Sequence, residues 1–235
     1  MGGSRGLLRP HDVPLGAALL SRVRDGCSVG ATPSSRGAAP SLLAGVAPTA
    51  YPRGVPADKT PVPFDASPAD RIAAAVKIYG ERETVDRAAA LLGGANAGED
   101  FLLFVGGTHA KGILDGAPAL YWPELWGARA LMYVWHDSAS NAIKSGLTNK
   151  AWRVREMCLK VVAARELPFA DLVVPMLTDE VGRVRAGAAR ALGKMGDHEH
   201  GTAIKLLLKD PDMEVRRPAG EALLAIKERF GRPID

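Results

Sequence analysis

The chain has 235 residues, of which 47% are hydrophobic, and its formal net charge at pH 7 is +4. The excess charge lies in residues 1–60, because residues 61–235 hold equal numbers of basic and acidic side chains. A balanced body lacks the electrostatic footprint of a nucleic-acid-binding protein. No segment approaches the roughly 20 apolar residues of a membrane span, and two distant cysteines exclude a disulfide framework. We therefore expect a cytoplasmic protein with neither a membrane nor a nucleic-acid partner.

Residues 1–60 are rich in Gly, Pro, Ala, Ser and Arg and show no sustained period. Pro and Gly at this density interrupt helices and strands, and the few bulky apolar side chains cannot offset the entropy lost on ordering. The sequence therefore predicts a disordered tail. An Arg- and Ser-rich, acid-poor start is also typical of organellar transit peptides, and a start codon placed too early would give similar text.

Residues 61–115 are predicted to form an N-terminal helical cap. Ser67 is a candidate N-cap, Pro68 fits the first turn after it, and Gly80 fits the end of this helix. A second helix is expected over 81–92, closed by two glycines. A DNA-binding helix-turn-helix is an alternative for this pair. Its second helix, however, mixes three carboxylates with two arginines, which is a poor surface for phosphates.

The stretch FLLFVGGTHAKG (101–112) contains glycines and a lysine, as phosphate-binding loops do. It lacks the GxxxxGK[ST] spacing that places backbone N–H groups around a phosphate. We expect instead a buried helix over 99–106 that ends at Gly106 and Gly107, followed by a further helical turn over 109–114.

Three similar segments begin at Leu147, Leu177 and Leu208, so the sequence repeats after 30 and then 31 residues. Each segment carries apolar residues at the i, i+4, i+7 and i+8 positions of an amphipathic helix. These positions are Val154, Cys158, Val161 and Val162, then Val184, Ala188, Ala191 and Leu192, then Val215, Ala219, Ala222 and Leu223.

A weaker fourth copy lies upstream, with Ala128, Leu131 and Met132 at three of the four positions and Glu124 at the remaining one. Each repeat is predicted to be a longer helix, a turn and a shorter helix. Such a hairpin cannot cover its own apolar face, and stacking of about three or more repeats buries a continuous core. The predicted fold class is all-α, an α-solenoid of about four repeats over 116–235.

The segment LTDEVGRVRAGAARALGKMGD (177–197) resembles the short HEAT-like repeats of phycobilisome lyases and of many bacterial proteins. The resemblance covers about 121–231. It implies a curved right-handed stack whose concave face binds a partner, usually a protein.

Arg155, Arg185 and Arg216 recur at one position of the repeat, and Asp179 and Asp210 lie six residues before the last two. We expect a structural ladder in which these side chains satisfy helix starts and link repeats. A basic stripe for a partner is the alternative.

Two features suggest chemistry without supporting it. His198, Glu199 and His200 are adjacent, whereas HEAT-like deoxyhypusine hydroxylases hold iron with His-Glu pairs from several repeats, and this chain has no counterpart one repeat away. Cys158 occupies the core position that Ala188 fills in the next repeat, which favours packing over nucleophilic chemistry. We therefore predict no catalytic residue, no metal site and no cofactor.

Aromatic residues gather between 121 and 152, where all four tryptophans lie. Because aromatic side chains are frequent binding anchors, Trp122, Trp126 and Tyr133 are candidate partner-binding residues. The alternative is a bulky core between the cap and the first repeat.

The sequence thus predicts a non-catalytic scaffold or adaptor that binds a protein on the concave face. An accessory lyase or chaperone-lyase that holds a cofactor or a protein substrate in the groove is the first alternative. A nucleic-acid-binding solenoid is the second.

Overall fold

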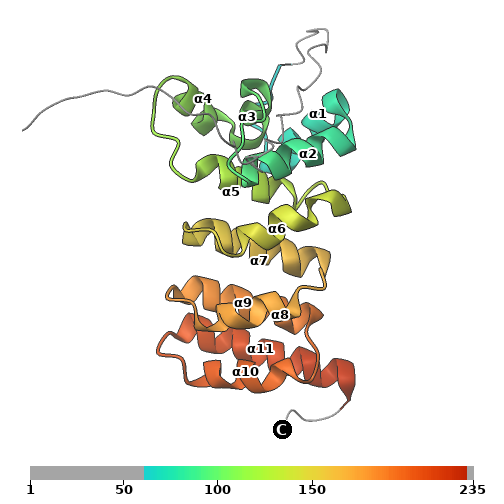
Figure 1. Cartoon of the computed structure of the whole chain (residues 1–235), viewed down its shortest axis with the longest axis vertical. Helices are drawn as coiled ribbons and strands as arrows, with labels where there is room; N and C mark the ends of the chain where they lie inside the picture. Colours follow the sequence, from blue (N-terminus) through green and yellow to red (C-terminus); the bar gives the residue numbers. More distant parts are fainter. Residues whose placement is uncertain (1–60, 232–235) are drawn as a thin grey trace, which may run out of the picture. The chain divides into compact units, whose positions relative to one another are not determined.

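The structure is a computed structural model that describes residues 61–231, and every regular element in this range is helical (Figure 1). The predicted tail, residues 1–60, lies outside the described residues. None of the described helices is both long and apolar enough to cross a bilayer. In chain order the helices are α1 (Pro68–Tyr79), α2 (Glu81–Leu92), α3 (Glu99–Gly106), α4 (Thr108–Leu114), α5 (Trp122–Ala130), η1 (Asp137–Ala139), α6 (Ser140–Gly146), α7 (Trp152–Arg165), α8 (Ala170–Val173), η2 (Val174–Thr178), α9 (Gly182–Met195), α10 (His200–Leu206), η3 (Leu207–Lys209) and α11 (Met213–Phe230).

The first four helices begin and end as the sequence predicts. The Ser67 hydroxyl accepts a hydrogen bond from the Asp70 N–H at 3.2 Å, which confirms the N-cap of α1. Gly80 joins α1 to α2 with a φ of 82° that favours glycine. The expected stop of α3 is confirmed, since Gly107 follows it with a φ of 61° and α4 begins at Thr108. No strand is present in the described residues to build a phosphate-binding loop.

From α5 onward, long and short helices alternate and stack in chain order (Figure 1). The long helices form a row in which α5 packs on α7, α7 on α9 and α9 on α11, while α6, α8 with η2, and α10 with η3 connect them. The predicted α-solenoid is thereby confirmed for the described part of the chain.

The repeated apolar stripe forms the core of this stack. Val154, Val184 and Val215 have no exposed surface although each belongs to a different repeat. Cys158 is also fully buried, and this burial raises the pKa of its thiol to about 12. Cys158 is therefore a packing residue, as predicted from its repeat position.

Two predicted core positions differ from the pattern. Leu223 is only half-buried, because α11 is the last described helix and that side chain has less to pack against. The first long helix, α5, ends at Ala130, so Met132 lies in a turn and is half-buried as well. Glu124 stands at the valine position of α5, and its buried Oε2 has no hydrogen-bond partner among the described residues.

Candidate functional site

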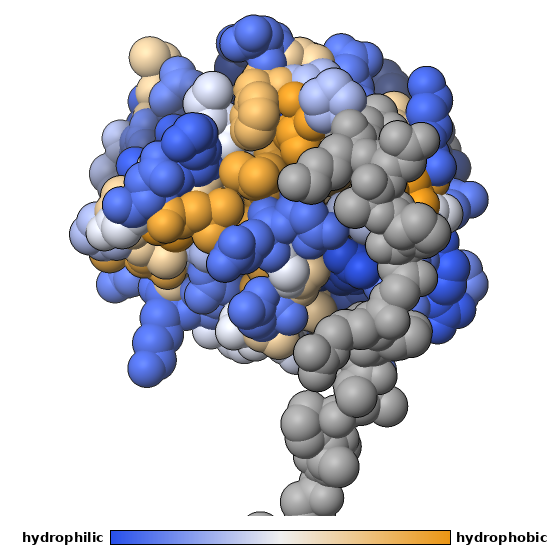
Figure 2. Space-filling view, turned by 90° about the horizontal axis from the view of Figure 1, so that it is seen from above, coloured by the Kyte–Doolittle hydropathy of each residue, from blue (hydrophilic) through white to orange (hydrophobic). Residues whose placement is uncertain are grey.

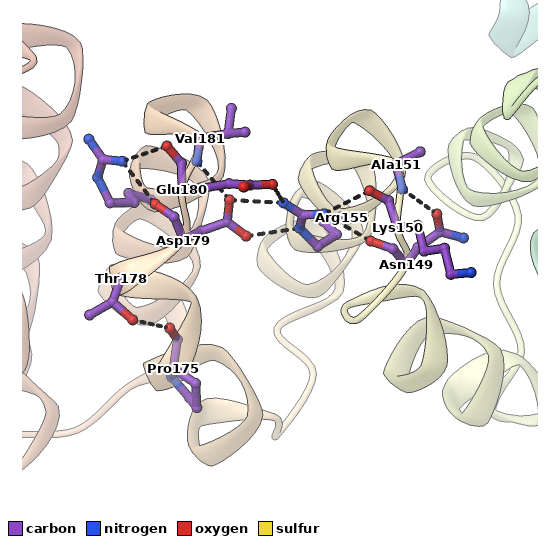
Figure 3. A network of polar contacts seen from close by, with 10 residues as sticks. Asn149, Lys150, Ala151, Arg155, Pro175, Thr178, Asp179, Glu180 and Val181 are labelled. Atoms are coloured by element: carbon purple, nitrogen blue, oxygen red, sulfur yellow. Dashed lines mark hydrogen bonds and ion pairs between the residues drawn. The ribbon is translucent and has the colours of Figure 1, made fainter. Parts of the chain in front are cut away.

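Successive repeats are linked by arginine–aspartate pairs at the start of the long helices (Figure 3). Arg155 donates to both carboxylate oxygens of Asp179, with Nε–Oδ2 at 2.8 Å and Nη2–Oδ1 at 2.9 Å. Arg185 binds Asp210 in the same two-pronged way at 2.7 and 2.9 Å. Each aspartate therefore receives the arginine of the preceding repeat, and the Arg185 hydrogen bond keeps the pKa of Asp210 below its usual value.

The same arginines also hold the turn of their own repeat. Arg155 donates through Nη1 to the Asn149 carbonyl at 2.9 Å, and Arg216 donates to the Asp210 carbonyl at 2.7 Å. Asn149 replaces the aspartate in the one repeat whose predecessor carries Leu125 at the arginine position. The aspartate is thus present where an arginine arrives to meet it. The Arg155 and Arg185 guanidinium groups are engaged within the stack.

A second set of arginines, which the sequence patterns did not reveal, lies at the opposite end of the long helices. Arg129 donates to the Val105 carbonyl at 2.7 Å, Arg165 to Met132 at 2.8 Å, and Arg229 to Lys194 at 2.6 Å. Each of these three side chains binds a carbonyl near the C-terminal end of a neighbouring helix. Their sequence signal was weak, since an arginine in the last turn of a helix is common for local reasons alone.

The three aromatic residues predicted to bind a partner do not share one surface. Trp126 is 2% exposed and lies in the core, where it stacks on Trp122 at 6.0 Å between ring centroids. Trp122 is half-buried and also meets His109 at 4.6 Å. Tyr133 is 47% exposed, after the end of α5. A partner can therefore reach Trp122 and Tyr133, whereas Trp126 is covered by α3 and α4 residues.

The exposed aromatic surface continues across the next two long helices. Arg153 lies over the Trp152 ring at 4.3 Å and over the Tyr121 ring at 5.8 Å, and Arg183 approaches Trp152 at 5.5 Å. Tyr121 in turn packs on Trp122 at 5.2 Å. We call these five residues the aromatic–arginine row. It runs over the N-terminal ends of α5, α7 and α9.

Arg153 and Trp152 escaped the sequence analysis for different reasons. The sequence analysis counted Trp152 among the four tryptophans but assigned it no role, although it stands 30 residues after Trp122 at the same repeat position. Tyr121, the second ring that Arg153 contacts, belongs to the preceding repeat. Only the register between α5 and α7 brings this ring and the guanidinium together.

The basic residues on and beside the row differ in whether a carboxylate pairs with them. Glu156, with a side chain only 13% exposed, accepts ion pairs from Arg183 at 3.0 Å and from Lys160 at 3.2 Å. Arg153 and Arg190 make no ion pair with any described residue. Arg153 and Arg190 thus add positive charge that no carboxylate among the described residues pairs with, although residues 61–235 as a whole are balanced.

The histidine-containing turn before α10 has a structural arrangement. His200 Nδ1 lies 2.6 Å from an Asp197 carboxylate oxygen and 3.1 Å from the Asp197 backbone nitrogen, so the imidazole packs against the turn. Within the described residues, no three His, Cys, Asp or Glu side chains are grouped as metal ligands.

The end of the stack formed by α1, α3 and α4 presents apolar side chains. Viewed from this end, Figure 2 shows apolar side chains gathered in the middle of the face with hydrophilic residues around them. Half-buried apolar residues on these helices include Leu102, Leu103 and Ile113.

Comparison with known proteins finds a similar repeat in part of the chain. Residues 140–224 match the model of HEAT repeats. A crystal structure of an engineered protein from the Northeast Structural Genomics Consortium is similar at 20% identity, with a TM-score of 0.42 over 69% of this chain and 85% of that chain. No curated protein matches the sequence. The family model does not distinguish the phycobilisome-lyase kind, so that subtype stays a prediction. The matched segment, residues 140–224, runs from α6 to the last turns of α11 and is similar to HEAT repeats.

Proposed function

We propose that this chain is a non-catalytic scaffold that binds a protein partner across α5, α7 and α9. HEAT repeats in general form protein-interaction scaffolds. The observation that carries the proposal is the aromatic–arginine row, in which ring and guanidinium contacts run without a break from Trp122 through Arg153 to Arg183.

The composition of the row suits a protein interface. Trp, Tyr and Arg are the residues enriched at interface hot spots. Trp152 and Arg153 are already stacked on one another in the free chain, so a partner loses less rotamer entropy in ordering them. Arg155, two residues after Arg153, ties α7 to the following repeat through its two hydrogen bonds to Asp179.

The helices before the repeats have a supporting role in this proposal. Both α2 and α3 pack against α5, and α5 is the long helix of the first repeat. We propose that α1–α4, within 61–115, cap the stack so that the apolar face of α5 is not exposed. A cytoplasmic location is part of the proposal and rests on the low cysteine content.

A capture experiment tests the scaffold role. The full-length chain is used as bait in nuclease-treated lysate of the source cell, beside Arg153→Ala/Arg183→Ala and the control Arg82→Ala/Arg217→Ala. The control removes two exposed arginines that pair within their own helices. We expect a protein retained by the native and control baits and lost with the row variant, and its binding is then measured with both purified components. Equal capture by all three baits would contradict the proposal.

A further inference from the structure

Positive charge on the row side of the stack is confined to two helices. The second residue of each long helix is Arg153 on α7 and Arg183 on α9, but Glu214 on α11. Seven residues later, about two helical turns along the same side, α7 carries Lys160 and α9 carries Arg190. The corresponding position of α11 holds Glu221, paired with an arginine of its own helix. The basic surface therefore ends where α11 begins.

The cations on α7 and α9 are accessible. The Arg183 and Lys160 side chains are 65% and 45% exposed, although both approach Glu156. Arg153 and Arg190 are exposed and have no carboxylate partner among the described residues. Two of the four cations thus share the mostly buried carboxylate of Glu156, and the other two have no ion pair among the described residues.

Stacking on Trp152 is a structural role that could by itself explain Arg153 and Arg183. It leaves their binding capacity intact, however, because a guanidinium stacks through its flat face while its N–H donors point outward in the plane. The carboxylate of Glu180, in the turn before α9, is 3.6 Å from Arg155 and so faces the ladder. Arg153 is therefore held in place with its donors available for carboxylates, whereas Arg183 already donates through Nε and Nη2 to Glu156 and offers its remaining Nη1 donors.

The spacing of the helices sets the spacing of the ligand. Packed helices lie about 8–10 Å apart, and Arg153 and Arg183 occupy the same position on neighbouring helices. A peptide in the extended polyproline II conformation advances about 3.1 Å per residue and presents every third side chain on the same side. Carboxylates on about every third residue would therefore meet successive helices of the stack.

We infer that the aromatic–arginine row, together with Lys160 and Arg190, binds an extended acidic segment of a protein. The segment carries carboxylates on about every third residue and an apolar side chain that packs on Tyr121 and Trp122, where the charge ends. This inference rests on the proposed scaffold function and names the chemistry of its partner. A protein is favoured over a nucleic acid because a longer run of phosphates would meet Glu214 and Glu221 on α11.

The test uses the full-length chain and a labelled peptide of about 12 residues, with Leu at one end and Glu at every third position in a Ser background. A matched peptide carries Gln in place of Glu. Binding is measured by fluorescence anisotropy at low ionic strength, where surface electrostatics are strongest. The variants are Arg153→Gln/Arg190→Gln and, as a control of equal charge change, Lys77→Gln/Lys227→Gln on α1 and α11. Circular dichroism checks that all of them are folded.

We expect the Glu peptide to bind at least tenfold more tightly than the Gln peptide. We also expect Arg153→Gln/Arg190→Gln to weaken its binding by about tenfold, which is ~1.4 kcal/mol, and the control to stay within about twofold. Equal binding of the two peptides, including no binding of either, would overturn the inference. So would a single-stranded oligonucleotide that binds more tightly than the Glu peptide.

Failure of this inference can be told apart from failure of the scaffold role. If the captured protein is lost with Arg153→Ala/Arg183→Ala but retained by Arg153→Gln/Arg190→Gln, the face binds a protein by packing alone. The scaffold then stands and the acidic partner is wrong. If neither variant changes what is captured, both proposals fail together.

Discussion

Val184 is fully buried between repeats, at the position that Val154 and Val215 occupy in the adjoining ones. Val184→Asp places a charge in this seam without a partner, and an isolated buried charge is among the most destabilising changes a chain can undergo. We expect a loss of about 4 kcal/mol or more, a large share of the typical stability of a domain. Thermal unfolding followed by circular dichroism measures it.

Thr202→Asp is the matched control for this variant. Thr202 is exposed in the first turn of α10, where a carboxylate interacts favourably with the helix dipole. Its melting temperature should be unchanged or slightly raised. A Val184→Asp chain that melts like the native one would show that the repeats have been aligned in the wrong register.

Gly193 of α9 lies directly against Ala222 of α11. A Cβ added there would lie 2.9 Å from both Cα and Cβ of Ala222, which is too close for an ordinary contact. We expect Gly193→Ala to cost about 1–3 kcal/mol through overpacking. By contrast, nothing lies within 4 Å of a Cβ added at Gly112 in α4, so Gly112→Ala should be neutral or stabilising.

Urea unfolding of the two glycine variants gives the comparison directly. If Gly193→Ala were as stable as Gly112→Ala, the close approach of α9 and α11 would be wrong. The result would not depend on any assumption about function.

At the scale of the element, the Arg185–Asp210 pair joins the start of α9 to the turn before α11. Asp210→Asn removes the charge that Arg185 binds and leaves a mostly buried guanidinium without its carboxylate. We expect a loss of about 1–3 kcal/mol at pH 7. The exposed Arg217–Glu221 pair serves as the control, and Arg217→Gln should cost less than about 0.5 kcal/mol.

The Arg185–Asp210 pair also makes a prediction about pH. The hydrogen bond from Arg185 lowers the pKa of Asp210 in the folded chain below its value of about 3.9 in the unfolded chain. The stabilisation is therefore complete above that unfolded-state pKa, and it is lost as the pH falls through the folded-state pKa. The stability gap between the native chain and Asp210→Asn should narrow below about pH 4. A gap that stays constant down to pH 2–3 would contradict this account.

The elements themselves were largely predictable. Ser67, Gly80 and the glycines after α3 set helix ends through local chemistry, and the structure confirms them. The shortness of α5 was not predicted, because its sequence continues the apolar pattern to Trp135 while the chain turns at Leu131. A turn imposed by packing leaves little trace in a pattern of apolar residues.

The candidate site was predicted less well than the elements, and Trp126 shows why. It lies off the apolar stripe of its own helix, which suggested exposure, yet α3 and α4 cover it and bring Gly106 and His109 against its ring. Contacts between non-repeated and repeated helices have no periodicity that could reveal them. The contact of Arg153 with Tyr121 was not predicted either, because the two residues belong to different repeats and no pattern within one helix indicates it.

At the scale of the whole molecule, Cys158 can report on the opening of the stack. Its thiol is fully buried and its pKa is raised to about 12, so the folded chain holds almost no reactive thiolate near pH 8. In a Cys27→Ser background, we expect a thiol reagent to label Cys158 about a thousandfold or more slowly than in urea. Fast labelling under native conditions would mean that α7 separates from its neighbours without global unfolding.

The repeat, its period, the buried stripe and most helix ends could be predicted from the amino-acid sequence, because each depends on residues that are near one another in the chain. It also supplied the members of the arginine–aspartate pairs, since they recur at fixed positions. Three further features are visible only in the tertiary structure. Each aspartate binds the arginine of the preceding repeat, Trp126 is buried, and Arg153 contacts aromatic rings from two repeats. These features depend on the register between packed helices. The interaction energies that fix this register are spread over many contacts, so no single sequence position indicates it.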